Sequence, residues 1–335
     1  MNDQNAQAPL TPQELELLER IAPDLLAALH ANRPRSLQIA HATLRMWKSK
    51  REQTPTPPPQ GIDDVTPEEP APTQLPAVQL PLWPEPVRAV PNGALRSALF
   101  GAIRKGRRRY MEQEQVAALA GIEVFYTGPR LDQGDLDVWE SALHLLRDKD
   151  LGTECRTTSY ALLKLMGLKD TGGERKNLHK RITRLAANAV EIRQGRYCYI
   201  GGLLHEAFKD EETQEWVLVL NPHLRALFAP DQFTMIQWGV RRALSGQPLA
   251  QWLHGFYSSH AAPLPIKIGT LHKLSGSEAG QLKKFTQTLK NALEAVARAC
   301  AAAGETFEWC IEDGLVYVTK TPTKAQRRHL AKRGK

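Results

Sequence analysis

Twelve of the chain's 23 prolines lie between Pro55 and Pro91. Proline has no backbone N–H and a fixed φ, so a tract this dense in proline cannot form the interior of a helix or a sheet. We therefore expect residues 54–93 to be an extended or disordered linker that divides the chain. At 335 residues, the chain is too long for one ordinary domain and short for three.

The segment ahead of this tract, residues 1–53, is predicted to be helical. Thr11, Pro12 and Glu14 are typical of an N-cap followed by a proline and an acidic residue in the first turn. Apolar residues then recur at helical spacing as far as Leu29, and a second short helix is expected from about residue 36 to residue 50.

The positive charge of the chain lies after the tract. The 44 lysines and arginines outnumber the 36 acidic residues, which gives a net charge of +8. Up to Gly93 there are 8 basic and 11 acidic residues, leaving 36 basic and 25 acidic residues behind it, so the two parts carry −3 and +11. This balance favours a polyanionic partner for the C-terminal part.

The same order of predicted elements occurs twice after the tract. Each copy has a long helix, a short helix, a turn, a basic helix and a two-stranded hairpin. The first copy, which follows a strand at 122–127, places these elements at about 137–148, 158–166, 174–188, 189–192 and 197–200. The second copy places them at about 249–259, 268–274, 278–303, 307–311 and 315–319.

Helix, helix, turn, helix and hairpin is the order of a winged helix-turn-helix. The sequence therefore predicts an α+β protein with tandem winged-helix domains at 94–205 and 206–321. The helical N-terminal segment and the Pro-rich linker precede them, and a basic tail at 322–335 follows. In such a domain the third helix packs one face on the core and presents the other to the DNA major groove.

Basic and amide side chains on the outer faces of these third helices are the candidate DNA contacts, because they read purine edges or neutralise phosphates. The candidates in the first copy are Lys176, Lys180, Thr183 and Arg184, and those in the second are Lys283, Lys284, Gln287, Thr288 and Asn291. Arg107 and Arg108, within a run of five cations at 104–109, are candidate phosphate contacts. A charged, solvent-facing helix without a ligand stays open as the alternative.

Motifs for catalysis and metal binding are absent from the sequence. There is no GxxxxGK[ST] phosphate loop, no closely spaced histidine pair and no CxxC pair among the four cysteines. We therefore expect a binding protein rather than an enzyme, with no metal and no cofactor. The lack of a signal peptide and of a long apolar run favours a reduced, cytoplasmic protein without membrane contact.

Several strings in the chain are long and unusual. They are Trp83–Asn92 continuing into Arg96–Phe100, Tyr126-Thr127-Gly128, Leu227-Phe228-Ala229, and Phe256–His260 followed by Pro263-Leu264-Pro265. On these strings the chain resembles the TrfA replication initiators of broad-host-range plasmids. The resemblance covers roughly residues 74–320.

The resemblance implies a plasmid replication initiator that binds directly repeated double-stranded origin DNA (iterons) and exists as monomer and dimer. It also implies opening of an adjacent A+T-rich region with the host initiator, recruitment of the host helicase, contact with the sliding clamp, and a part in plasmid copy number. Single-stranded A+T-rich origin DNA is a further candidate ligand. A winged-helix transcriptional regulator without replication activity is the main alternative, and a relaxase or primase is a third.

The family's clamp-binding motif has the form Gln-Leu-Ser-Leu-Phe and lies in its linker. Gln79, Leu80, Leu82 and Trp83 match this form, with a glutamine to hydrogen-bond and apolar side chains to fill a pocket. An ungapped alignment of the Trp83 segment instead places the motif on residues 74–78. A structural linker, in which Trp83 packs within the protein, is the remaining alternative.

Overall fold

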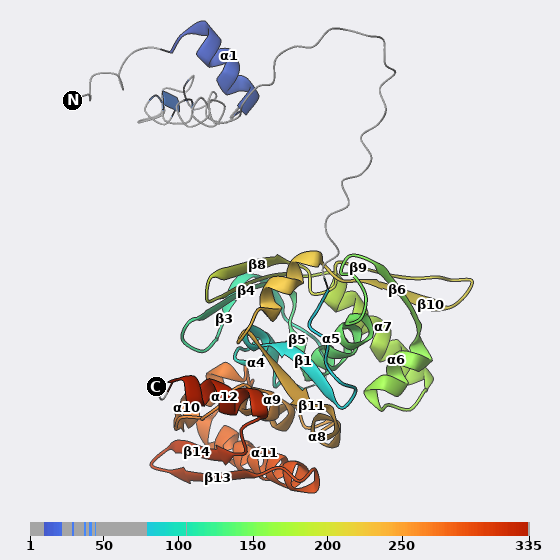
Figure 1. The fold of residues 1–335 in the computed structure, drawn as a ribbon, viewed down its shortest axis with the longest axis vertical. Coiled ribbons are helices and arrows are strands. Elements are labelled where there is room, and N and C mark those ends of the chain that lie inside the picture. Colours follow the sequence, from blue (N-terminus) through green and yellow to red (C-terminus); the bar gives the residue numbers. More distant parts are fainter. Residues whose placement is uncertain are drawn as a thin grey trace, which may run out of the picture. The chain divides into compact units, whose positions relative to one another are not determined.

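The computed structural model describes residues 10–21, 79–104 and 106–333, with five further positions at 29, 37, 40, 41 and 44 (Figure 1). These residues belong to two units, Met1–Thr73 and Gln74–Lys335. They contain both helices and sheets, which confirms the predicted α+β class. No helix among them is long and apolar enough to cross a membrane.

The N-terminal unit contains helix α1, Pro12–Ile21. Its start is capped as the sequence predicts: the Thr11 amide donates to Glu14 Oε2 at 3.2 Å, and the Glu14 amide donates to Thr11 Oγ1 at 3.4 Å. Leu18 is buried together with Ala40 and Leu44, which lie in the region of the second predicted helix. The four described positions from 37 to 44 are helical, and the rest of that prediction lies outside the described residues.

The end of the proline-rich tract is folded, which corrects the predicted linker boundary at residue 93. Strand β1, Val87–Pro91, pairs antiparallel with β11, Phe233–Gln237. The four residues ahead of Pro91 contain no proline and can form this strand. Pro91 is tolerated because it is the last residue of the strand. Residues 54–78 of the predicted linker lie outside the described residues.

The predicted repeat is present in the C-terminal unit, and each copy also has a short strand before its second helix. The first copy consists of α5 (Gln133–Leu146), β6 (Glu154–Thr158), α6 (Ser159–Met166), α7 (Gly172–Ala186), β9 (Glu206–Lys209) and β10 (Glu215–Val219). The second consists of α9 (Pro248–Ser258), β12 (Ile266–Lys267), α10 (Ile268–Leu274), α11 (Leu282–Ala302), β13 (Phe307–Glu312) and β14 (Leu315–Lys320). The two three-stranded sheets have equivalent orders, β6–β10–β9 and β12–β14–β13.

The hairpin predicted for the first copy belongs to a different sheet. Its strands β7 (Ala189–Gln194) and β8 (Tyr197–Gly201) form as expected. However, they extend a four-stranded sheet, β3–β4–β7–β8, with β3 (Tyr110–Val116) and β4 (Ile122–Pro129). The hairpin of the repeat is β9–β10, which the sequence concealed because β10 is a continuous apolar run rather than an alternating one.

This hairpin also corrects the domain boundary predicted between residues 205 and 206, which would separate β9 and β10 from α7. One hydrophobic core ends at Ile236, and the other begins at Val240. The two copies therefore meet near residues 237–239, and both lie within one compact unit.

Short elements complete the C-terminal unit. They are α4 (Asn92–Leu95), β2 (Phe100–Gly101), β5 (Leu131–Asp132), the 3-10 helix η2 (Pro222–Phe228), α8 (Trp238–Ala243) and α12 (Lys324–Arg333). The predicted basic tail thus contains a helix.

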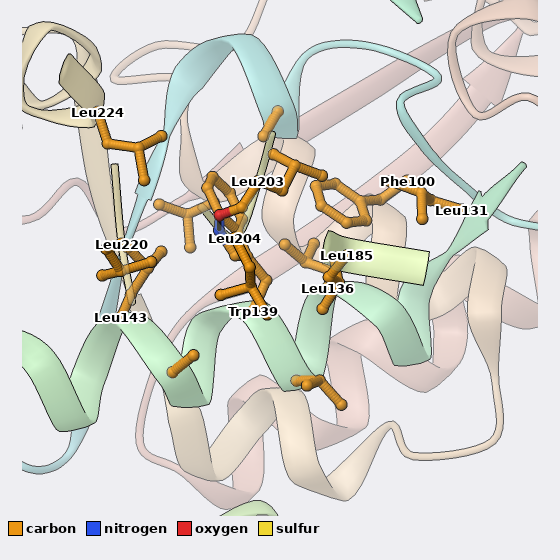
Figure 2. Packing of buried hydrophobic residues seen from close by; sticks show 14 of the residues in the cluster. Phe100, Leu131, Leu136, Trp139, Leu143, Leu185, Leu203, Leu204, Leu220 and Leu224 are labelled. Atoms are coloured by element: carbon orange, nitrogen blue, oxygen red, sulfur yellow. Dashed lines mark hydrogen bonds between the residues drawn. The ribbon is translucent and has the colours of Figure 1, made fainter. Parts of the chain in front are cut away.

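Helix α5 lies at the centre of the larger core (Figure 2). Leu136, Trp139 and Leu143 project from it into this core, and Leu185 of α7 belongs to the same cluster. The Trp139 indole N–H donates to the Leu203 carbonyl at 2.9 Å, so its buried polar atom is satisfied. Packing of α7 on α5 leaves the opposite face of α7 to the solvent.

Candidate nucleic-acid interface

Helix α7 presents three of its four predicted contacts to the solvent. The helix begins where the Glu174 amide donates to Thr171 Oγ1 at 3.2 Å. Leu178, Ile182 and Leu185 form the predicted buried stripe. The exposed face opposite carries Lys176, Lys180 and Thr183.

Arg184 is not free to contact DNA, which corrects its assignment. Its Nη2 lies 2.6 Å from Oδ1 of Asp135, a fully buried carboxylate at the start of α5. Burial and the neighbouring Asp132 raise the pKa of Asp135 to about 6, and Arg184 opposes this shift. The ion pair of Arg184 with Asp135 therefore links α7 to α5.

Helix α11 presents all five of its predicted contacts. Phe285, Leu289, Leu293 and Val296 are buried as expected, whereas Leu282, which the sequence placed in the same stripe, is half exposed because the helix begins there. The exposed face carries Lys283, Lys284, Gln287, Thr288 and Asn291.

Two of these α11 side chains are hydrogen-bonded to each other. Gln287 Nε2 donates to Asn291 Oδ1 at 3.3 Å. This bond aligns two amides along the helix. An amide in this position can break the bond and form hydrogen bonds to the edge of an adenine instead. The exposed surface of α11 therefore combines cations with amide groups.

The arginines of the loop between β2 and β3 have different environments. Arg107 is exposed. Arg108 is ion-paired with Asp132, and its Nη1 donates to the Arg104 carbonyl at 3.0 Å. Arg108 therefore anchors this loop to the start of α5, and of the two candidates only Arg107 is available to a phosphate.

A cavity beside α7 contains two basic side chains, Arg175 and Lys209, that the sequence did not point to. This hairpin cavity, of about 470 Å³, lies between α6, α7 and the β9–β10 hairpin. Arg175, His179 and Lys209 line it together with the exposed Tyr160. Lys209 lies on β9, the strand that the sequence did not place, so only the fold brings it beside α7.

The predicted clamp-binding segment is mostly packed into the protein. Leu80 and Trp83 are buried, whereas Leu82 is 69% exposed. The Trp83 ring stacks on Phe228 with 6.2 Å between centroids, and its N–H donates to His144 Nδ1 at 3.0 Å. Trp83 thus packs within the protein, which is the arrangement expected for a structural linker.

Gln79, the fourth member of that segment, is also engaged within the protein. Its Nε2 donates to Asp150 Oδ1 at 3.0 Å, and its backbone forms an isolated β-bridge with Asp150. The competing match at residues 74–78 lies outside the described residues.

Comparison with known proteins identifies one family. The family model of the TrfA protein matches residues 66–320, which is more than half of the chain. The plasmid replication initiator protein TrfA of Escherichia coli is 28% identical over 229 residues, which cover 66% of this chain and 59% of that protein. The match thus spans less than two thirds of that relative.

Solved structures with some likeness include domains of RctB and the Pi initiator protein. Domains 2 and 3 of RctB have a TM-score of 0.45 at 14% identity, over 69% of this chain and 97% of theirs. The Pi initiator protein in complex with iteron DNA has a TM-score of 0.41 at 9% identity, over 56% of this chain and 91% of its own.

Proposed function

This chain belongs to the TrfA protein family, and we propose that it is a plasmid replication initiator. It binds directly repeated origin DNA through α7 and α11, the recognition helices of two winged helices in one chain. It then promotes opening of an adjacent A+T-rich region and brings in the host initiator, helicase and sliding clamp. Its action needs no catalytic site of its own.

The observation that carries this proposal is the duplicated β–α–α–β–β arrangement within one unit. Each copy has a three-stranded sheet of the same order, and each offers an exposed, cationic third helix. Two such helices in one chain can enter consecutive major grooves about one helical turn apart. A single chain would then occupy one iteron, and direct repeats would bind a row of chains.

Base contacts are proposed for the exposed polar side chains of both helices, Lys176, Lys180 and Thr183 on α7 and Lys283, Lys284, Gln287, Thr288 and Asn291 on α11. Phosphate contacts are proposed for Arg107 and for Lys209 of the hairpin cavity, where Arg175 is paired with Asp170 at 2.6 Å. Arg184 and Arg108 support these surfaces without touching DNA, because buried carboxylates hold both side chains.

Contact with the sliding clamp is proposed for the segment from Gln79 to Trp83. Because Leu80 and Trp83 are buried, clamp binding through this segment requires both to leave the core. Leu82→Ala tests the assignment without disturbing the core, since Leu82 is exposed. Unchanged capture of the clamp by this variant would rule the segment out.

A transformation test separates an initiator from a transcriptional regulator. The gene would be supplied together with DNA that carries the repeats bound by the protein, and autonomous replication would be scored. An initiator supports replication of that DNA, and Lys284→Ala with Asn291→Ala abolishes it. A protein that represses a promoter bearing the same repeats but never supports replication would establish the regulator instead.

A further inference from the structure

The two copies of the repeat meet at a second cationic cavity, which neither recognition face includes. This seam cavity has a volume of about 450 Å³ and is bordered by α5 and α7 on one side and by α8 on the other. Its charged lining includes Arg104, Arg181, Arg242, Asp132, Asp137 and Glu174.

The wall of the seam cavity is a preformed structure. Arg241 of α8 is fully buried; its Nε donates to Asp137 Oδ1 at 2.8 Å, and its Nη2 donates to the Gln133 carbonyl at 3.1 Å. Both acceptors belong to α5, so α8 and α5 are fixed to each other. A ligand of the cavity therefore meets side chains that are already in place.

The seam cavity carries a surplus of positive charge. Asp132 is neutralised by Arg108, and Asp137 is neutralised by Arg241. Among the described residues, Arg104, Arg181 and Arg242 form no ion pair, and Glu174 is the carboxylate of the lining that forms none. The lining as a whole holds four arginines, Arg241 included, against three carboxylates, which leaves a net charge of +1.

Two glycines leave room for the guanidinium groups at this cavity. A Cβ atom at Gly134 would overlap the guanidinium of Arg181, and one at Gly167 would overlap that of Arg242. Gly167 also ends α6 with φ 72°, so Arg242 lies at a helix C-terminus, where the helix dipole favours a cation. The space that each of these guanidinium groups occupies thus depends on a glycine.

The seam cavity and the hairpin cavity lie on opposite flanks of α7. At ~100° per residue, Arg181 falls on one side of the face formed by Lys176, Lys180 and Thr183, and His179 falls on the other. A helix in the major groove, which is ~12 Å wide, has a phosphate backbone on each side. One backbone would meet the hairpin cavity and the other would meet the seam.

We propose that the seam cavity binds a DNA backbone phosphate between the two half-sites, with Arg181 and Arg242 as its ligands and Arg104 at its rim. This site rests on the proposed function, because it assumes that α7 and α11 lie in consecutive major grooves. The contact carries no base information, and it fixes the register of the two helices on the duplex.

The test compares Arg181→Gln and Arg242→Gln with Arg193→Gln as the matched control, in the full-length chain. Arg193 is an exposed arginine on β7 that is paired with Glu191 at 2.6 Å and that lines neither cavity. Binding to a duplex of about three helical turns, selected from a random pool by the unsubstituted chain, would be followed from ~50 to ~200 mM salt.

For each seam variant, the fall of log K with log salt should be shallower by about 0.9. Over this salt range, each variant should therefore lose about 3.5-fold less affinity than the unsubstituted chain. The selected sequence should not change, and Arg193→Gln should match the unsubstituted chain. A neutral methylphosphonate at the contacted position between the half-sites should weaken the unsubstituted chain and leave Arg181→Gln unaffected.

Unchanged slopes for both seam variants would overturn the proposal. So would a changed preference for A·T pairs between the half-sites, since that would mean contact with the groove floor. Failure to select any sequence would count against the proposed function alone, because the salt slope can also be measured on an unselected duplex.

Discussion

At the scale of single residues, the partner of a side chain decides whether a basic residue can bind DNA. Lys180 and Arg184 lie one turn apart on α7, and both project from the same flank in a helical projection. Lys180 is exposed, whereas Arg184 pairs with buried Asp135. The sequence predicts the exposed positions from the buried stripe, but it could not predict Asp135, which lies 49 positions away in the chain.

We expect Arg184→Ala to destabilise the fold by ~3–5 kcal/mol, because it leaves a buried carboxylate unpaired. The DNA affinity of the folded fraction should stay the same. Lys180→Ala should do the reverse, with stability within ~0.5 kcal/mol of the unsubstituted chain and weaker binding. Urea unfolding and binding titrations on both variants check this, and a stable Arg184→Ala with weakened DNA binding would contradict it.

Trp83 and Leu82 provide a second contrast between neighbours. Trp83→Ala removes a ring that stacks on Phe228 and should lower the free energy of unfolding by ~3–5 kcal/mol. Leu82→Ala should change it by less than ~0.5 kcal/mol, since that side chain is exposed. Thermal unfolding of the two variants distinguishes them. Equal stabilities would mean that Trp83 does not belong to the core.

At the scale of elements, local patterns predicted most helices but misplaced one hairpin. Gly167 ends α6 as expected, and the alternating strands β13 and β14 meet at Asp313-Gly314. The hairpin β9–β10 escaped because β10 is a continuous apolar run, and because β10 pairs with β6 through residues more than 50 positions apart, such as Trp216 and Thr157. Non-local pairing of this kind leaves no periodic signal in the sequence.

The hairpin tips are acidic, which affects how each copy can approach DNA. The β9–β10 turn contains Glu211 and Glu212, and the β13–β14 turn contains Asp313 next to Glu312. Phosphates would repel both tips, so we expect the helices rather than the tips to hold the duplex.

Replacing Glu211 and Glu212 together by lysine should therefore leave the salt slope of DNA binding within ~0.5 of its original value. Arg107→Ala serves as the comparison, and it should lower the slope by about 0.9 because Arg107 is a proposed phosphate contact. A rise of about 2 in the double lysine variant would place the tip against the DNA backbone.

Helix α9 contains a buried histidine that makes stability depend on pH. Burial lowers the pKa of His254 to about 3, with Arg241 and Lys320 adding to the shift. The unfolded chain, with a histidine pKa of ~6.5, binds more protons below that pH, so stability falls as the pH is lowered from ~6.5 towards 3.

We expect His254 to contribute up to ~1.4 kcal/mol of lost stability per pH unit in this window. His254→Leu should flatten the acid side of the stability curve, while stability between pH 7 and pH 8 should show little dependence on residue 254. Urea unfolding at a series of pH values measures both. Parallel curves for the variant and the unsubstituted chain would show that folding does not lower the pKa of His254.

At the scale of the whole molecule, contacts of the second copy with the rest of the C-terminal unit set the geometry in which α7 and α11 are presented. Arg130, which lies between β4 and β5 just ahead of the first copy, reaches Glu278 of the second, with Nη1 3.0 Å from Oε1, and it donates to the Gly276 carbonyl. The Ala102 amide, just after β2, donates to the Ser275 carbonyl at 2.7 Å. These contacts join the segments ahead of α5 to the turn that leads into α11.

The sequence predicts the duplication, but it does not predict the junction between the copies. Matching helix and hairpin patterns indicated two copies, whereas the boundary depended on which core Ile236 and Val240 enter. The contacts of Arg130 and Arg241 join segments more than 100 positions apart, so only the fold shows that the two helices belong to one compact unit.

Selection of DNA from a random pool tests most directly the claim that one chain reads one iteron with two helices. The unsubstituted chain, Lys180→Ala in α7 and Asn291→Ala in α11 would each be used for selection. We expect a two-part motif with centres about one helical turn apart. Each variant should lose base preference in a different part, by ~1–3 kcal/mol at a directly contacted base. A single undivided motif, or loss at the same positions in both variants, would contradict the account.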